Sequence, residues 1–259
     1  MPSSLKSTSE GGTLILTLSN PESKNALSPE MYAAGIEALN AFETNPDIKS
    51  VILTGEGADF CAGGNLQRLL VNRQRPKDVQ AQSIDGLHSW IEAIHTYPKP
   101  VIAAVEGAAA GAGFSLALAC DFCVAANTAI FAMSHSTVGL SPDGGGSWAL
   151  ARGLPRQLAS QLMMCGDRIS AQRLFDLGLV NQVCGKGEAR TEALLLAGRL
   201  NARAANALGS IKELVNDAAV QTLSQQLTQE RDHFVNNLHH ANAAEGIHAF
   251  LQKRPPSYS

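Results

Sequence analysis

Two glycine-rich segments have the composition of sites that bind negative charge through backbone N–H groups. One spans residues 55–64 and the other residues 107–113, and each lies between an apolar strand-like run and a helix-like run. Small residues allow close backbone approach, and the first N–H groups of a helix lack intrahelical acceptors. Neither segment matches a phosphate-binding P-loop or a dinucleotide fingerprint. An oxyanion is therefore a candidate ligand, and tight packing between strand and helix is the alternative role of these glycines.

The cysteines offer little support for a metal site. Cys120 and Cys123 have the spacing of half a zinc site, but no second pair follows them. We predict no metal and expect the five cysteines to be free, reduced and buried, as is typical of a cytoplasmic protein. The N-terminal residues lack the apolar core of a signal peptide, and no apolar run is long enough to cross a membrane.

Composition indicates a globular protein with a full core. The chain has 259 residues, of which 45% are hydrophobic and 17% charged, and its net charge is −3. This length allows one large domain or two small ones. The basic residues are scattered, which argues against nucleic acid as a partner.

Strands and helices alternate in the first part of the pattern, and helices dominate the last. Ser28 and Pro29 have the types of an N-cap and a first helical residue. The alternation predicts an α/β core in residues 1–200 and a helical C-terminal region in residues 201–259. Strands are expected at residues 13–18, 51–54, 101–105, 122–125, 130–133 and 179–183, and helices from residues 29, 66, 79, 114 and 147 onward.

Six segments, in order along the chain, resemble the enoyl-CoA hydratase/isomerase (crotonase) family. They are Asn20–Leu27, Phe60–Leu66, Pro98–Val105, Gly139–Gly146, Gly178–Asn181 and Glu245–Arg254. The resemblance covers nearly the whole chain. It implies a crotonase (ClpP-like) spiral of ββα units and a C-terminal region that forms trimers and covers coenzyme A (CoA). Trimers of this family often pair into hexamers.

The same resemblance implies an acyl-CoA thioester substrate and an oxyanion hole for its enolate. The N–H groups of Gly64 and Ala112 match the two oxyanion donors of the family. Lys24, Ala26, Ala62, Gly63 and Leu66 match positions along the CoA path, and Lys253 matches a lysine that reaches CoA phosphates, often from a neighbouring subunit. A solvated charge is the alternative for Lys253. No further cofactor is expected, because the substrate carries the CoA.

Departures from the family pattern favour an isomerase. Hydratases of this family use two glutamates, whose positions are occupied here by Ser115 and His135. Asp143 matches the acid of an isomerase branch that includes ring-epoxide isomerases. One carboxylate can move a proton between two carbons while the oxyanion hole holds the charge. The alternative role of Asp143 is to cap the next helix.

Two histidines keep other interpretations open. His88 matches a histidine of aryl-CoA dehalogenases, whose nucleophile takes the place of Asp143, but the aromatic clamps of those enzymes are missing at Gly64 and His135. His135 can act as an acid or a hydrogen-bond donor, or simply fill the pocket wall. A hydratase and a non-catalytic acyl-CoA-binding scaffold remain alternatives.

Overall fold

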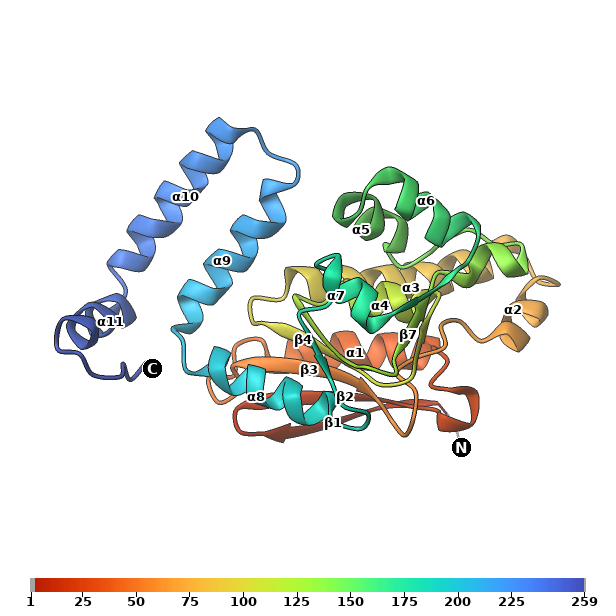
Figure 1. Ribbon diagram of the computed structural model, residues 1–259, viewed down its shortest axis with the longest axis horizontal. Coiled ribbons are helices and arrows are strands. Elements are labelled where there is room, and N and C mark those ends of the chain that lie inside the picture. Colours follow the sequence, from red (N-terminus) through yellow and green to blue (C-terminus); the bar gives the residue numbers. More distant parts are fainter. Residues whose placement is uncertain (1–2, 259) are drawn as a thin grey trace.

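The strands of the computed structural model, which describes residues 3–258, form two sheets (Figure 1). The larger sheet has six strands in the order β1-β2-β3-β4-β6-β9, and the smaller has three in the order β5-β7-β8. In the larger sheet β1 and β2 pair antiparallel, and the pairs β2–β3, β3–β4, β4–β6 and β6–β9 are parallel. The strands are β1 (Ser4–Glu10), β2 (Thr13–Ser19), β3 (Ser50–Gly55), β4 (Val101–Val105), β5 (Ala108–Ala110), β6 (Phe122–Ala126), β7 (Ile130–Ala132), β8 (Arg168–Ser170) and β9 (Gln182–Cys184).

The chain passes repeatedly from the larger sheet to the smaller one and then into a helix. Strand β4 of the larger sheet leads into β5 of the smaller sheet and then into α4, and β6 leads likewise into β7. The predicted α/β class is confirmed. The helices are α1 (Pro29–Phe42), α2 (Leu66–Asn72), α3 (Lys77–Thr96), α4 (Ala112–Leu118), α5 (Gly146–Gly153), α6 (Arg156–Met164), α7 (Ala171–Asp176), α8 (Ala189–Asn201), α9 (Ala205–Ala218), α10 (Leu223–Leu238) and α11 (Ala241–Leu251), with 3₁₀ helices η1 (Pro21–Ser23) and η2 (Ser134–Val138).

Both faces of the central strands are covered, which explains why their sequences are apolar throughout. On one face, Ile15 and Ile52 pack against a stripe of alanines on α8 that includes Ala193. On the other face, Leu16 belongs to the main core together with Trp90 of α3. The two sets alternate along each strand because neighbouring side chains point to opposite faces.

Local signals located several elements correctly. The Ser28 hydroxyl accepts a hydrogen bond from the N–H of Met31, so Ser28 caps α1 as predicted. Strand β1 was not expected, because its polar, mostly exposed residues show no apolar alternation. The expectation of buried thiols holds for Cys61 and Cys123 but is wrong for Cys165, which is exposed at the C-terminal end of α6.

The last three helices extend away from the sheets at one end of the long axis (Figure 1). Lys212 of α9 links them to the core, since its Nζ lies 2.8 Å from Asp121 Oδ2 and 2.9 Å from the carbonyl oxygen of Ile94. The domain boundary at residue 200 stays a prediction. Across residues 3–258, no helix combines the length and the hydropathy that a membrane span requires.

Candidate active site

Backbone hydrogen bonds hold the two glycine-rich segments side by side. The N–H of Cys61 donates to the carbonyl of Ala108, and the N–H of Ala110 donates to the carbonyl of Cys61, both at 2.9 Å. Gly63 has a φ of +90°, and a Cβ there would lie 2.6 Å from the carbonyl oxygen of Ala110 and 3.2 Å from the nitrogen of Ala112. This close approach therefore requires glycine at position 63.

Two backbone N–H groups are available at this junction. Ala112 is the first residue of α4, so its N–H has no acceptor inside the helix. The bridge to the neighbouring loop uses the N–H of Leu27 and the carbonyl of Gly63. In residues 3–258, none of the backbone hydrogen bonds joining this segment to its neighbours uses the N–H of Gly64. The two groups can therefore serve as donors to a ligand oxygen.

Both residues line a pocket of about 420 Å³. The pocket collects most of the residues that the sequence singled out, together with apolar side chains from α2, α3 and the loop before α5. Its lining includes Ala62, Gly64, Leu66, Leu69, Gln80, Ile84, His88, Ala112, His135, Leu140, Pro142 and Asp143.

The Asp143 carboxylate points to His135 rather than to a helix end. Its Oδ1 lies 3.1 Å from His135 Nε2. Gly145 occupies the N-cap position of α5, and none of the side chains in the described part of the chain caps that helix. The Asp143 side chain therefore does not cap α5, the role that the sequence offered as the alternative to catalysis.

The backbone of Asp143 is also held in place. Its carbonyl oxygen accepts hydrogen bonds from the Ser115 hydroxyl at 2.8 Å and from the N–H of Gly146 at 3.1 Å. Ser115 is 1% exposed, so its hydroxyl is shielded from solvent. The turn that carries Asp143 is thus tied to α4, the helix that begins with Ala112.

Burial raises the pKa of two ionisable side chains near this site. It raises the pKa of the Cys61 thiol to about 12, although the N–H of Gly63 acts in the opposite direction. Burial is also the main reason that the pKa of Tyr32 is raised, and the negative charge of Asp143 adds to this rise, while Arg68 opposes it. Cys61 therefore lacks the thiolate character of a nucleophile, and Asp143 lies within electrostatic reach of Tyr32.

Four predicted binding residues do not line this pocket. Lys24 is exposed, and its carbonyl accepts a hydrogen bond from the N–H of Ala62 at the pocket wall. Ala26 is buried nearby, and Gly63 lies behind the junction with α4. Lys253 is exposed just after α11, and α11 lies at the opposite end of the molecule from α2 (Figure 1). The CoA contacts of these residues stay predictions.

Sequence reasoning missed Gln80 and Ile84, which line the pocket from α3. They precede His88 at intervals of four residues, so all three lie on one face of the helix. That spacing was a usable signal. Ser115 gave no comparable signal, because its hydrogen bond to Asp143 depends on a turn 28 residues later.

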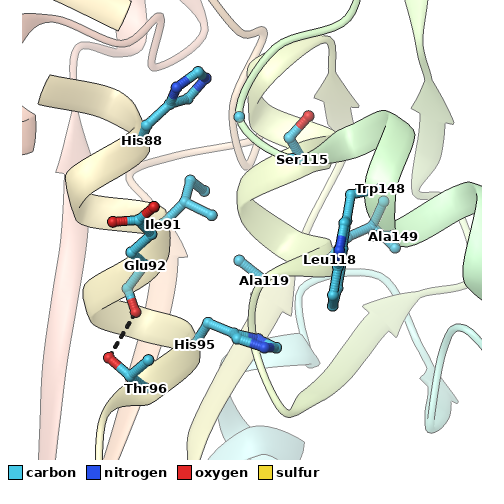
Figure 2. Close-up of a pocket in the computed structure, with 12 residues that line it drawn as sticks. His88, Ile91, Glu92, His95, Thr96, Ser115, Leu118, Ala119, Trp148 and Ala149 are labelled. Atoms are coloured by element: carbon cyan, nitrogen blue, oxygen red, sulfur yellow. Dashed lines mark hydrogen bonds between the residues drawn. The ribbon is translucent and has the colours of Figure 1, made fainter. Parts of the chain in front are cut away.

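A second pocket of about 360 Å³ adjoins the first, and His88 lines both. Figure 2 shows residues of α3, including Ile91 and His95, on one side and Leu118 and Trp148 on the other. His95 meets the Trp148 ring edge-on, with 5.4 Å between the ring centroids. The second pocket therefore extends the apolar lining past the turn that carries Asp143.

Comparison with known proteins identifies the family. The family model described as enoyl-CoA hydratase/isomerase matches residues 8–259. The chain belongs to this family. Among curated relatives of the family, the 1,2-epoxyphenylacetyl-CoA isomerase of Escherichia coli is 38% identical, with 96% of each chain covered. The 2,3-dehydroadipyl-CoA hydratase of the same species is 34% identical, with 95% of this chain and 94% of the relative covered.

Solved structures of the family share the fold. An enoyl-CoA hydratase from Polaromonas sp. JS666 superposes with a TM-score of 0.98, at 73% identity, with 99% of this chain and 100% of that one covered. An enoyl-CoA hydratase subunit from Geobacillus kaustophilus is 33% identical, with a TM-score of 0.92 and coverage of 99% and 98%. The predicted crotonase fold is confirmed, and the relatives include both isomerases and hydratases.

Proposed function

We propose that this protein is an acyl-CoA isomerase that moves the double bond of an enoyl-CoA thioester. The observation that carries the proposal is the arrangement of one pocket, which combines the free N–H groups of Gly64 and Ala112 with the Asp143 carboxylate. These are the two functions that a proton shift next to a thioester requires, an anion site and a base.

In the proposed reaction, Asp143 removes a proton from the carbon between the double bond and the thioester carbonyl. The electrons of that C–H bond delocalise into a dienolate, and the N–H groups of Gly64 and Ala112 stabilise the negative oxygen. The protonated Asp143 then returns the proton two carbons further along, and the double bond becomes conjugated. No net proton is gained or lost, so one carboxylate is sufficient.

Hydration is the second candidate, because a relative at 73% identity is named an enoyl-CoA hydratase. Addition of water requires one group to activate the water and another to manage the α-proton. Ser115 and His135 occupy the positions of the family's two hydratase glutamates, and Ser115 is committed to the backbone of Asp143. The site therefore supports a one-base reaction better than hydration.

The dehalogenase-like alternative has weaker support. His88 lines the same pocket as Asp143, as that chemistry would require. However, Gly64 offers no side chain to clamp an aromatic ring, and His135 contacts the carboxylate instead. Under that mechanism a covalent ester at Asp143 would accumulate in His88→Gln, and intact-protein mass spectrometry would detect it.

We further propose a homotrimer, which can pair into a hexamer. Large apolar side chains of α9–α11 are exposed, among them Val215, Phe234 and Phe250, which is 82% exposed. Exposed apolar surface of this extent marks an interface. In such an assembly Lys253 would approach CoA from a neighbouring subunit, with Lys24, Ala26, Ala62, Gly63 and Leu66 forming the rest of the CoA path. Sedimentation as a concentration-independent monomer would contradict this assembly.

The decisive test is Asp143→Asn, assayed with 3-enoyl-CoA and 2-enoyl-CoA thioesters of short and medium chain length. Isomerisation, followed by the ultraviolet absorbance of the conjugated product, should fall by about 10²–10⁴, the usual contribution of a positioned base. The variant should keep its stability, because the N-cap position of α5 belongs to Gly145 and not to Asp143. Wild-type isomerisation in Asp143→Asn would overturn the mechanism, and hydration of 2-enoyl-CoA as the faster wild-type reaction would favour the second candidate.

A further inference from the structure

Residues of two other elements contact Asp143, one at its backbone carbonyl and one at its carboxylate. Ser115 of α4 donates to its backbone carbonyl at 2.8 Å, while His135 of η2 contacts Oδ1 at 3.1 Å. The His135 side chain is 10% exposed and that of Asp143 is 25% exposed. These contacts therefore form in a largely shielded place, where hydrogen-bond geometry has greater weight than at the surface.

The surroundings of His135 select one tautomer. A neutral imidazole carries one N–H donor and one acceptor nitrogen. Nε2 faces the Asp143 carboxylate, which accepts a hydrogen bond. Nδ1 is buried and has no hydrogen-bond partner among the described residues. A proton on Nδ1 would be a buried donor without an acceptor, which is costly. The proton consequently lies on Nε2, and His135 donates to Oδ1.

The turn of Asp143 packs too closely on α4 to move freely. A Cβ at Gly144 would lie 3.1 Å from Cβ of Ser115, and a Cβ at Gly146 would lie 2.5 Å from the Ser115 hydroxyl oxygen. Gly144 and Gly145 both have positive φ values, +58° and +76°. The glycines thus bring the turn against Ser115, whose hydroxyl then anchors the carbonyl of Asp143.

We infer that Ser115 and His135 are positioning residues that leave Asp143 with a single reactive oxygen. Ser115 fixes the backbone, and His135 occupies Oδ1 through its Nε2–H. Oδ2 accepts the proton from the substrate carbon and returns it to the second carbon. The Nε2–H bond of His135 does not break in this cycle. The inference deepens the proposed isomerase function and rests on it.

Other ionisable groups near the carboxylate must be considered in any measurement of pH dependence. His88 lines the same pocket from α3. Tyr32 of α1 responds to the charge of Asp143, and Arg68 of α2 acts on Tyr32. These groups remain in every variant of His135, so a change in the pH profile can be assigned to the substitution itself.

The test compares His135→Leu with His135→Gln, using the 3-enoyl-CoA thioester that wild type isomerises fastest. Leucine removes the donor, whereas the glutamine amide can place an N–H near the position of Nε2. We expect kcat to fall about 10- to 100-fold in His135→Leu with little change in KM, the effect of one hydrogen bond to a charged group. The acid limb of kcat should move to higher pH, because a donor stabilises the carboxylate form. His135→Gln should restore both.

Ser115→Ala tests the second anchor. It should lower kcat by a smaller factor, about 3- to 10-fold, because the lost bond joins neutral groups. The acid limb should stay in place, since the carboxylate keeps its contact with His135. A shifted acid limb in Ser115→Ala, or wild-type kcat, would contradict the assignment of separate tasks to the two residues.

The outcomes separate this inference from the function on which it rests. Wild-type isomerisation in Asp143→Asn would contradict the proposed function itself. Inactive Asp143→Asn with a wild-type rate and profile in His135→Leu would overturn the inference alone. Equal losses in His135→Leu and His135→Gln, with no shift of the acid limb, would show a steric role and also overturn it. If His135→Leu does not fold, ¹⁵N NMR of the wild-type protein can show which imidazole nitrogen of His135 carries the proton. A proton on Nδ1 would refute the inference.

Discussion

Replacing Ala112 by proline would remove one proposed oxyanion donor without removing a side chain that the fold needs. Ala112 is the first residue of α4, a position where proline is well tolerated because its N–H has no intrahelical acceptor. The preceding residue is Gly111, with φ +52° and ψ −125°, and it has no Cβ to collide with a proline ring. The change should therefore act on catalysis more than on folding.

The expected magnitude follows from the surroundings of this N–H. Ala112 is 2% exposed and lines the pocket, so an enolate oxygen beside it would find little water to replace the lost donor. Loss of one oxyanion donor costs about 10²–10³ in kcat, or about 3–4 kcal/mol. The proline ring would also occupy the place of the hydrogen, so we expect about 10³. Ala112→Gly keeps the N–H and should change kcat little.

The assay is kcat for isomerisation of the preferred 3-enoyl-CoA, with calorimetric binding of a non-reacting acyl-CoA and a melting temperature for each variant. Ala205→Pro is a matched control, because Ala205 is the exposed first residue of α9, away from the pocket. It should melt near the wild-type temperature and retain full activity. Wild-type kcat in Ala112→Pro, with normal binding, would remove this N–H from the mechanism.

Two further predictions concern the C-terminal helices. Lys212→Met should lower the free energy of unfolding by about 1–3 kcal/mol in denaturant titrations, because partly buried Asp121 then keeps, among the described residues, only the hydrogen bond from the N–H of Val101. The double variant with Asp121→Asn should recover part of the loss, and equal losses would contradict the pairing. Arg254 donates hydrogen bonds that lower the pKa of Glu245 from 4.5 to about 2. The ion pair should therefore stabilise this turn fully above pH 4.5, and this stabilisation should be lost as the pH falls toward about 2. The Ser257 amide, which donates to Glu245, should report the transition by NMR, and a midpoint near 4.5 would refute the ion pair.

The sequence determined features that depend on neighbouring residues. Ser28 followed by Pro29 marked the start of α1, because capping needs only a hydroxyl and the first free N–H groups. Apolar runs marked β3 and β4, since strands covered on both faces must be apolar throughout. The order of six segments along the chain indicated the family that the comparisons confirmed.

Elements without such local signals required the tertiary structure. Strand β1 is polar because it pairs at the edge of the sheet and stays mostly exposed, so no alternation announced it. The exposure of Cys165 likewise depends on how α6 packs rather than on its apolar neighbours. Edges and surfaces are properties of the assembled chain, and a sequence window does not contain them.

The role of Asp143 shows the same division. An aspartate before three glycines has the sequence of a helix cap, and only the contact with His135 and the position of Gly145 at the N-cap distinguish the two roles. The pairing of Cys61 with Ala108 and Ala110 likewise brings together backbone N–H groups almost fifty residues apart. The residue types were readable from the sequence. Their orientation was not, because hydrogen bonds between distant segments determine where a carboxylate and a backbone donor point.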